Sequence, residues 1–186
     1  TRETTRVSVF VASLPFSGMV FAYGCLDEKL PAWLNAHRRA FEYFGGVTQV
    51  VVPDNASTAS NQISKADRAR EVNAEYAEFL EYYRTADVPA RSLSPRDKGH
   101  VEAGVKFVTN WLFRFLADRK FASLDELNAA VAVQIDVIND RTPFRGEPRS
   151  RREWFEDIER AELLELPAQP WRPVVWRKAK VNRDWH

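Results

Sequence analysis

The chain has 186 residues, of which 45% are hydrophobic and 28% are charged, and its formal net charge is +1. This composition allows one sizeable hydrophobic core and argues against an intrinsically disordered chain, while the small net charge does not by itself indicate a nucleic-acid binder. A single cysteine excludes an internal disulfide, and no apolar run reaches the roughly 20 residues that span a bilayer. We therefore expect a cytoplasmic protein that does not enter a membrane.

Two apolar, β-rich runs near the N-terminus are separated by turn residues. Residues 7–14 and 19–24 flank a Pro-Phe-Ser-Gly sequence, which predicts an antiparallel hairpin. Pro31 is typical of the first turn of a helix. This helix is expected to reach about Phe44, where Gly45 would end it.

A short run of β-branched residues follows and ends abruptly. Residues 50–52 are all valine, and proline and Asp54 come next, which predicts a buried strand that carries an acid to the carboxyl edge of a sheet. The polar residues 56–70 are expected to form a flexible surface loop. A helix over 73–83 and a short strand over 88–91 are predicted after this loop.

Helices dominate the second half of the predicted structure. A long helix is expected over 98–116 and another over 123–139, because Ser123 and Glu126 have the spacing of a capping box. A shorter helix is predicted over 151–160. This order of elements fits a mixed α/β sheet flanked by helices. The sequence contains no glycine-rich phosphate loop, so it does not indicate a dinucleotide-binding fold.

Two acids are candidates for chemistry, namely Asp54 at the strand end and Glu102 on the long helix. Such a pair is typical of sites that transfer phosphoryl groups with two metal ions. Lys98 and Lys106 lie one turn before and after Glu102 on the same helical face, where they would bind phosphates. Two simpler interpretations stay open: Asp54 serves a turn, and the lysines form salt bridges with Glu102 on a solvated face. The apolar stripe of this helix is expected at Val101, Val105, Val108, Leu112 and Phe115.

Basic residues gather in two segments near the C-terminus, 141–152 and 172–183, and the second is interleaved with tryptophans. Cations of this kind neutralise DNA phosphates whatever the base sequence. A solvated loop and the half-buried strand of a small barrel are the alternative interpretations. The candidate DNA contacts are Arg96, Lys98, Lys106, Arg149, Arg151, Arg177, Lys178 and Lys180.

Six short motifs are together more specific than the two acids alone. They are FEYFGGV at 41–47, VVVPDN at 50–55, RDKGHVE at 96–102, NDRTP at 139–143, SRREWF at 150–155 and WRKAKV at 176–181. In this order, and over nearly all of the chain, they resemble the IstA-type insertion-sequence transposases, which are members of the DDE superfamily with a core like that of retroviral integrases.

The resemblance implies an RNase H-like fold with an Asp-Asp-Glu triad, in which Asp54 matches the second acid and Glu102 the third. It places the first acid on a strand upstream of residue 1, so the chain would be truncated at its N-terminus and inactive alone. The complete protein would hold two Mg²⁺ or Mn²⁺ ions. Without its first, central strand the sheet would have open edges, to be filled by another chain, a swapped segment or upstream residues.

The division into domains follows from the same resemblance. We expect a partial catalytic core over 1–162, a linker over 163–173 and the start of a basic β module over 174–186. The implied function is metal-dependent DNA cleavage and strand transfer in transposition. The implied partners are element-end and target DNA, further copies of the protein and a helper AAA+ ATPase. The implied location of the protein is the bacterial cytoplasm, where it would be associated with the nucleoid when bound to DNA.

Two rival interpretations belong to other classes of protein. In the first of them, the chain is a non-catalytic DNA-binding or oligomerisation fragment of such a transposase. An unrelated α/β hydrolase is less favoured, because the nucleophile motif of that class is missing.

Overall fold

A β-hairpin forms the centre of the fold. The computed structural model describes residues 4–53, 60–62, 70–72, 74–88 and 95–172. In it β1 (Ser8–Ser13) pairs antiparallel with β2 (Val20–Cys25), from Ser8 opposite Cys25 to Ser13 opposite Val20. The predicted hairpin is therefore confirmed.

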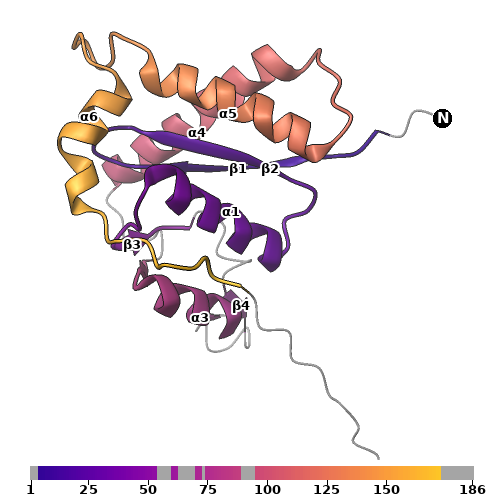
Figure 1. Cartoon of the computed structure of the whole chain (residues 1–186), viewed down its shortest axis with the longest axis vertical. Coiled ribbons are helices and arrows are strands. Elements are labelled where there is room, and N and C mark those ends of the chain that lie inside the picture. Colours follow the sequence, from indigo (N-terminus) through magenta and orange to yellow (C-terminus); the bar gives the residue numbers. More distant parts are fainter. Residues whose placement is uncertain (1–3, 54–59, 63–69, 73, 89–94, 173–186) are drawn as a thin grey trace, which may run out of the picture.

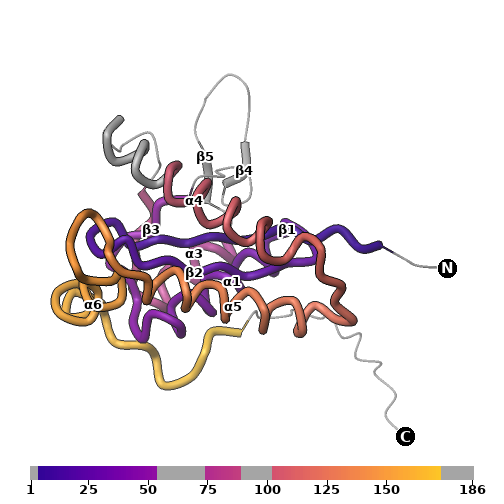
Figure 2. Tube along the Cα trace, turned by 90° about the horizontal axis from the view of Figure 1, so that it is seen from above, coloured from indigo at the N-terminus to yellow at the C-terminus, as the bar shows by residue number. Residues whose placement is uncertain are grey.

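Helices cover both faces of this hairpin (Figures 1 and 2). The helix α1 (Leu30–Phe44) packs on one face, while α4 (Pro95–Leu116) and α5 (Leu124–Asp140) lie side by side on the other. The alternation of side chains along β2 sets this arrangement. Val20 and Ala22 join the core cluster with α4 and α5, whereas Met19 and Phe21 join the cluster with α1.

The ends of the predicted helices agree with the local signals in the sequence. Gly45 ends α1 in the left-handed conformation with φ of 70°, which favours glycine. Ser123 accepts a hydrogen bond from the Glu126 backbone N–H, 3.1 Å away, and so caps α5. The Glu126 carboxylate bonds the N–H of Ala122 rather than that of Ser123, so the expected capping box is shifted by one residue.

The strand after α1 is short and lies apart from the hairpin. In the described residues β3 (Val50–Val51) pairs in parallel with β6 (Ala86–Asp87), and the hairpin forms a separate two-stranded sheet. The prediction of a buried strand is wrong for Val50, whose side chain is 44% exposed. The predicted strand 88–91 is also displaced, because β6 lies before it; residues 89–91 lie outside the described residues.

The predicted surface loop 56–70 contains ordered backbone pairing. Within it and just beyond it, β4 (Ser60–Gln62) pairs antiparallel with β5 (Arg70–Val72). A two-stranded ribbon forms through backbone hydrogen bonds, so a polar sequence without hydrophobic periodicity gives no sign of it. Residues 60–62 and 70 are therefore in strands, where a flexible surface loop was predicted, and residues 56–59 and 63–69 lie outside the described residues.

The remaining elements close the fold around α1. The helix α3 (Ala74–Tyr83) packs its buried Tyr76 and Phe79 against α1. The short helix α6 (Arg151–Asp157) and the 3-10 helix η2 (Glu159–Glu162) follow α5. No described helix is both long enough and apolar enough to cross a bilayer.

The residues that follow η2 run back along α1 and α3. We call residues 163–172 the C-terminal strap, which is the yellow segment of Figure 1. Leu164 and Val47 exchange two backbone hydrogen bonds of 2.8 and 2.9 Å, and Trp171 packs its ring on Phe79, with 5.3 Å between centroids. Leu163, Leu164 and Trp171 of the predicted linker 163–173 are thus packed on the core. Residues 173–186 lie outside the described residues.

Candidate functional site

Of the two predicted catalytic acids, the structure describes only Glu102. Its side chain is exposed on α4, and Lys106, one turn later, is also exposed. Asp54 lies outside the described residues, so the juxtaposition of the two acids stays a prediction. The described chain stops at Pro53, which is buried directly after β3. The described residues contain no group of three or more His, Cys, Asp and Glu side chains placed to hold a metal ion.

Among the other predicted DNA contacts, too, the structure describes some side chains and not others. Arg96 and Lys98 belong to α4, but their side chains lie outside the described part of the structure, as do Arg177, Lys178 and Lys180 altogether. Arg149 and Arg151 are described and lie in the segment between α5 and α6 and at the start of α6.

The buried stripe of α4 differs from the predicted one. Val108 and Leu112 are buried as expected, and Leu116 joins them one turn later. The prediction is wrong for Val105 and Phe115, which are 37% and 46% exposed. The side of α4 that packs on β1, β2 and α5 follows Val108, Leu112 and Leu116, with the partly buried Trp111 next to them, and Val105 and Phe115 lie outside it.

An acid that the sequence argument did not select lies at the end of β6. Asp87 is opposite Val51 in the parallel pair, at the carboxyl end of β3 from which the chain leads to Asp54. Burial raises the pKa of Asp87, and the Tyr76 hydroxyl, which donates to its Oδ1 at 3.1 Å, opposes that shift. The sequence signal for this acid was weak, since two strand residues are too few to show a period.

A cavity of about 210 Å³ opens between α4 and the hairpin turn, and Glu102 is not among the residues that line it. One wall is a face of α4, with Ala103, Gly104 and Phe107. The other walls are the hairpin turn and the segment between α5 and α6. The residues from these last two walls are Ser13, Leu14, Pro15, Gly18, Val20, Phe144, Arg145 and Arg151.

Aromatic rings hold the arginines at this cavity. The Arg151 guanidinium lies 4.1 Å from the Phe144 ring centroid and 5.3 Å from that of Phe107, and Arg145 lies 4.8 Å from Phe144. Arg141 lies nearby over Trp111, at 5.4 Å. Burial lowers the pKa of Arg151, and the positive charges of Arg145 and Arg141 lower it further. The positive charges of Arg141, Arg145 and Arg151 are therefore held close together.

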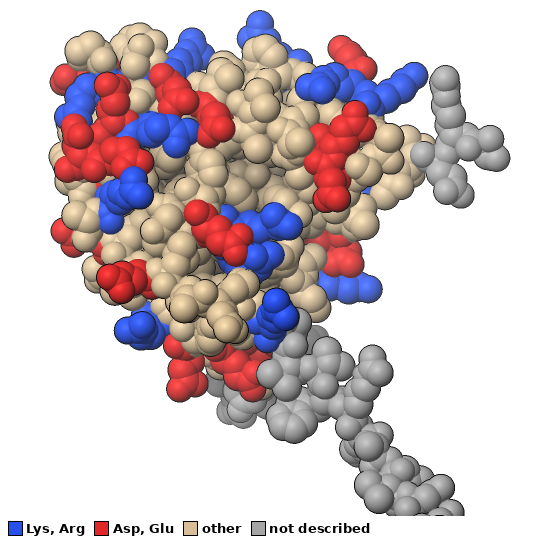
Figure 3. Space-filling view, in the orientation of Figure 1, with Lys and Arg blue, Asp and Glu red and all other residues tan. Residues whose placement is uncertain are grey.

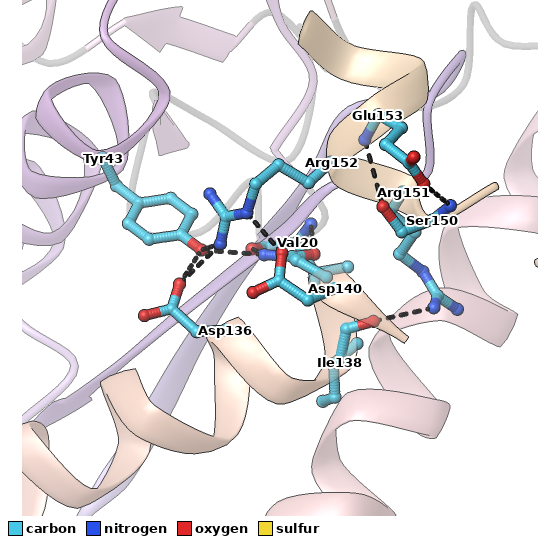
Figure 4. A network of polar contacts seen from close by, with 10 residues as sticks. Val20, Tyr43, Asp136, Ile138, Asp140, Ser150, Arg151, Arg152 and Glu153 are labelled. Carbon is cyan, nitrogen blue, oxygen red and sulfur yellow. Dashed lines mark hydrogen bonds and ion pairs between the residues drawn. The ribbon is translucent and has the colours of Figure 1, made fainter. Parts of the chain in front are cut away.

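Other charged residues of this region have structural partners. Arg149 forms an ion pair with Asp157. Arg152 contacts Asp136 at 2.7 Å and Asp140 at 2.5 Å, and the Tyr43 hydroxyl donates to the same Asp136 oxygen, as Figure 4 shows. These contacts connect α1, α5 and α6.

The acids in and after α6 also have structural roles. Glu153 completes a capping box with Ser150, a signal of the S-x-x-E type that the sequence argument overlooked. Glu159 accepts the backbone N–H of Ser17 at 2.9 Å. On the face of the molecule in Figure 3, acidic and basic side chains are interspersed, so this face has no extended region of one charge.

The chain is similar in sequence to curated proteins that are named as transposases. The chain is 39% identical over 178 residues, 96% of its length, to "Putative transposase y4uI" of Sinorhizobium fredii. It is 37% identical over its whole length to "Putative transposase for insertion sequence IS1162" of Pseudomonas fluorescens. The chain spans about a third of the length of these curated relatives, 34% and 33%. No protein-family model matches it.

Solved structures identify the fold. The catalytic core domain of BIV integrase superposes with a TM-score of 0.61 at 15% identity, over 84% of this chain and 90% of that one. The catalytic core domain of HTLV-2 integrase in complex with magnesium gives 0.57 at 18% identity, over 81% and 92%. The chain therefore has the RNase H-like fold of integrase catalytic cores, as predicted.

Proposed function

We propose that this chain is the catalytic-core region of an IstA-type DNA transposase, which cleaves DNA strands and joins them during insertion-sequence transposition. The observation that carries the proposal is the combination of two independent likenesses. Sequence similarity to insertion-sequence transposases extends over nearly the whole chain, and the fold is that of integrase cores. We also propose that the chain is part of a longer protein, with a first triad acid upstream of residue 1 and a core, linker and β module divided as predicted.

The proposed site consists of Asp54 and Glu102 together with that upstream acid. Glu102 supports this role because its side chain is exposed on α4, one helical turn before the exposed Lys106. Carboxylates are the ligands that Mg²⁺ and Mn²⁺ prefer, so Glu102 and Asp54 would hold the ions. The ions that these carboxylates would hold would supply activation of the attacking oxygen and stabilisation of the leaving one.

The rest of the proposed site would bind DNA through its phosphates. Lys106 on α4 would contact a strand next to Glu102 and so hold the reacting phosphate in position. The proposed partners are element-end and target DNA, further copies of the protein and a helper AAA+ ATPase. The wider set of proposed DNA contacts is Arg96, Lys98, Arg149, Arg151, Arg177, Lys178 and Lys180.

Strand joining by the complete transposase tests this proposal. With a labelled duplex that carries an element end and with Mg²⁺ present, Glu102→Gln and Asp54→Asn should each lower the joining rate by more than about 100-fold, because each removes a metal ligand. Chelation of the metal should abolish joining. Glu78→Gln, which changes an exposed glutamate on α3, is the matched control and should join at the normal rate.

A normal joining rate in both acid variants would contradict the proposal. DNA binding that is unaffected by either acid or by the metal, together with no detectable joining by the parent protein, would favour the non-catalytic DNA-binding fragment instead.

A further inference from the structure

We propose that the cavity between α4 and the hairpin turn is a binding pocket for a backbone phosphate of the DNA strand, held by Arg145 and Arg151. We call it the Arg145–Arg151 pocket. This inference rests on the proposed function, because it assigns the anion to DNA that is led toward Glu102. It adds a defined pocket in which Arg145, a residue of the basic segment 141–152 that was not among the individual candidate contacts, makes the principal contact.

The pocket is built by segments that are distant in the sequence. The hairpin turn, α4 and the segment between α5 and α6 each supply a wall. Gly18 has φ of 68°, and a Cβ there would lie 2.8 Å from the Phe144 ring, so glycine is required for this ring to seat against the turn. At Gly104 a Cβ would meet no atom within 4 Å, which shows how open the α4 wall is.

The charge of the pocket is positive and uncompensated within the described residues. Its lining contains Arg145 and Arg151 but no aspartate or glutamate. Neither arginine forms an ion pair with a described carboxylate, in contrast to Arg149, Arg152 and Arg160, which all do. Because the guanidinium groups of Arg145, Arg151 and Arg141 repel one another, a bound anion would relieve an unfavourable interaction already present.

The arrangement of the rings favours a phosphate over a stacked nucleobase. The guanidinium groups of Arg145 and Arg151 both lie against the Phe144 ring. The Phe107 ring contacts the Arg151 guanidinium and lies 5.9 Å from the Trp111 ring, measured between centroids. The rings are thus already in contact with other groups, and the N–H edges of the guanidinium groups remain for binding. Each arginine has five N–H donors, and one main-chain hydrogen bond is formed by each, from Arg145 to Phe16 and from Arg151 to Ile138. A fork of N–H donors matches the oxygens of a phosphate.

The backbone of Arg145 supports a role in binding rather than in stability. Its φ is 54°, in the left-handed region, while Gly146 beside it has φ of 77°. A residue other than glycine in that conformation costs about 1–2 kcal/mol. An arginine here is therefore unfavourable for folding, and this cost is consistent with a function for its side chain at the rim of the pocket.

Binding of a fluorescently labelled DNA duplex to the transposase, followed by anisotropy over a series of NaCl concentrations, tests the pocket. Arg145→Gln should weaken binding about tenfold, as expected for the loss of a charge-assisted hydrogen bond. It should also reduce the slope of log affinity against log salt by about one, the change expected when one phosphate contact is lost. Arg145→Lys should keep the slope and recover part of the affinity, because it keeps the charge without the fork.

The matched control is Arg160→Gln. Arg160 is exposed and its guanidinium pairs with Glu156 at 2.5 Å, so its loss should change neither affinity nor slope. Phe144→Leu should weaken binding without altering the slope, since it loosens the support of the arginines but removes no charge. Circular dichroism of each variant shows that the fold is retained; if Phe144→Leu unfolds, the Arg145 variants still decide the matter.

Three outcomes would overturn the pocket. In the first, Arg145→Gln binds DNA as tightly as the normal protein does. In the second, it binds more weakly but the slope of log affinity against log salt is unchanged. In the third, inorganic pyrophosphate alone raises the thermal midpoint in an Arg145-dependent manner, while the affinity for DNA does not depend on Arg145. The last result would assign the pocket to a free phosphate compound.

The failure of the pocket is distinguishable from failure of the catalytic proposal. Loss of joining in Glu102→Gln with normal DNA binding in Arg145→Gln would reject only the pocket. The expected DNA-binding defect in Arg145→Gln together with normal joining in Glu102→Gln would reject only the catalytic assignment.

Discussion

At the scale of single residues, two asparagines of α5 satisfy the backbone of β2 along its edge away from β1. Asn139 accepts the Val20 N–H at 3.0 Å and donates to the Val20 carbonyl at 2.8 Å, and Asn128 makes the same two bonds to Gly24 at 2.7 and 3.1 Å. A side-chain amide can do this because it carries a donor and an acceptor side by side. Asn139 is also fully buried and donates to the Tyr43 hydroxyl. The amides thus replace a neighbouring strand at this edge.

We predict that Asn139→Ala lowers the free energy of unfolding by about 2–4 kcal/mol. The substitution leaves the buried N–H and C=O of Val20 without partners, and each unsatisfied group costs about 1–3 kcal/mol. Urea denaturation measures the change, with Asn110→Ala, at an exposed position of α4, as the control expected to stay within about 0.5 kcal/mol. A loss of less than 1 kcal/mol for Asn139→Ala would show that water replaces the amide.

At the scale of elements, the C-terminal strap depends on a close approach at Gly46. A Cβ at this position would lie 2.6 Å from the Leu163 Cβ and 3.0 Å from the Leu164 carbonyl oxygen. Both neighbours belong to the strap, and Leu164 is fixed by its two hydrogen bonds to Val47. The absence of a side chain at Gly46 is therefore what allows the strap to pair with the chain after α1.

We predict that Gly46→Ala destabilises the protein by about 1–3 kcal/mol, the usual effect of overpacking. The same substitution at Gly104 provides a control of opposite sign. A Cβ there has open space within α4, so Gly104→Ala should stabilise by up to about 1 kcal/mol through helix propensity. Thermal unfolding of the two variants measures both signs, and a stabilising Gly46→Ala would mean that the strap moves away without cost.

At the scale of the whole molecule, His37 couples pH to the stability of the core. It lies on α1, its ring is 4.7 Å from Phe10 of β1 and 6.3 Å from Phe79 of α3, and it is 8% exposed. Burial lowers the pKa of His37 to about 4, with a smaller opposing effect from its hydrogen bond to the Trp33 carbonyl. The imidazole is therefore neutral in the folded protein at pH values where the unfolded chain already binds a proton.

We predict that this difference destabilises the protein as pH falls from about 6.5 to about 4, because the unfolded state binds more protons over that range. The full contribution is on the order of 3 kcal/mol. Urea midpoints between pH 7 and 4.5 should fall more steeply for the normal protein than for His37→Gln or His37→Phe, whatever the stability of these variants at pH 7. Equal slopes would show that carboxylates alone cause the acid sensitivity.

The sequence by itself determined the elements that carry local signals. The turn residues between β1 and β2, Pro31 and Gly45 around α1, and the cap at Ser123 each act within a few residues, so they can be recognised without knowing the rest of the fold. The family motifs, which combine many such positions, also predicted the RNase H-like fold that the solved structures confirm.

Only the tertiary structure decided which residues meet. The pairing of β3 with β6, the outward orientation of Val105 and Phe115, and the meeting of Gly18, Phe107 and Arg145 at one cavity all join segments that are distant in the sequence. Hydrophobic periodicity reports that a residue is apolar and on which face it lies, but not which partner covers that face. Contacts of this kind are set by packing of the complete chain, and for this reason the Arg145–Arg151 pocket was not visible in the sequence.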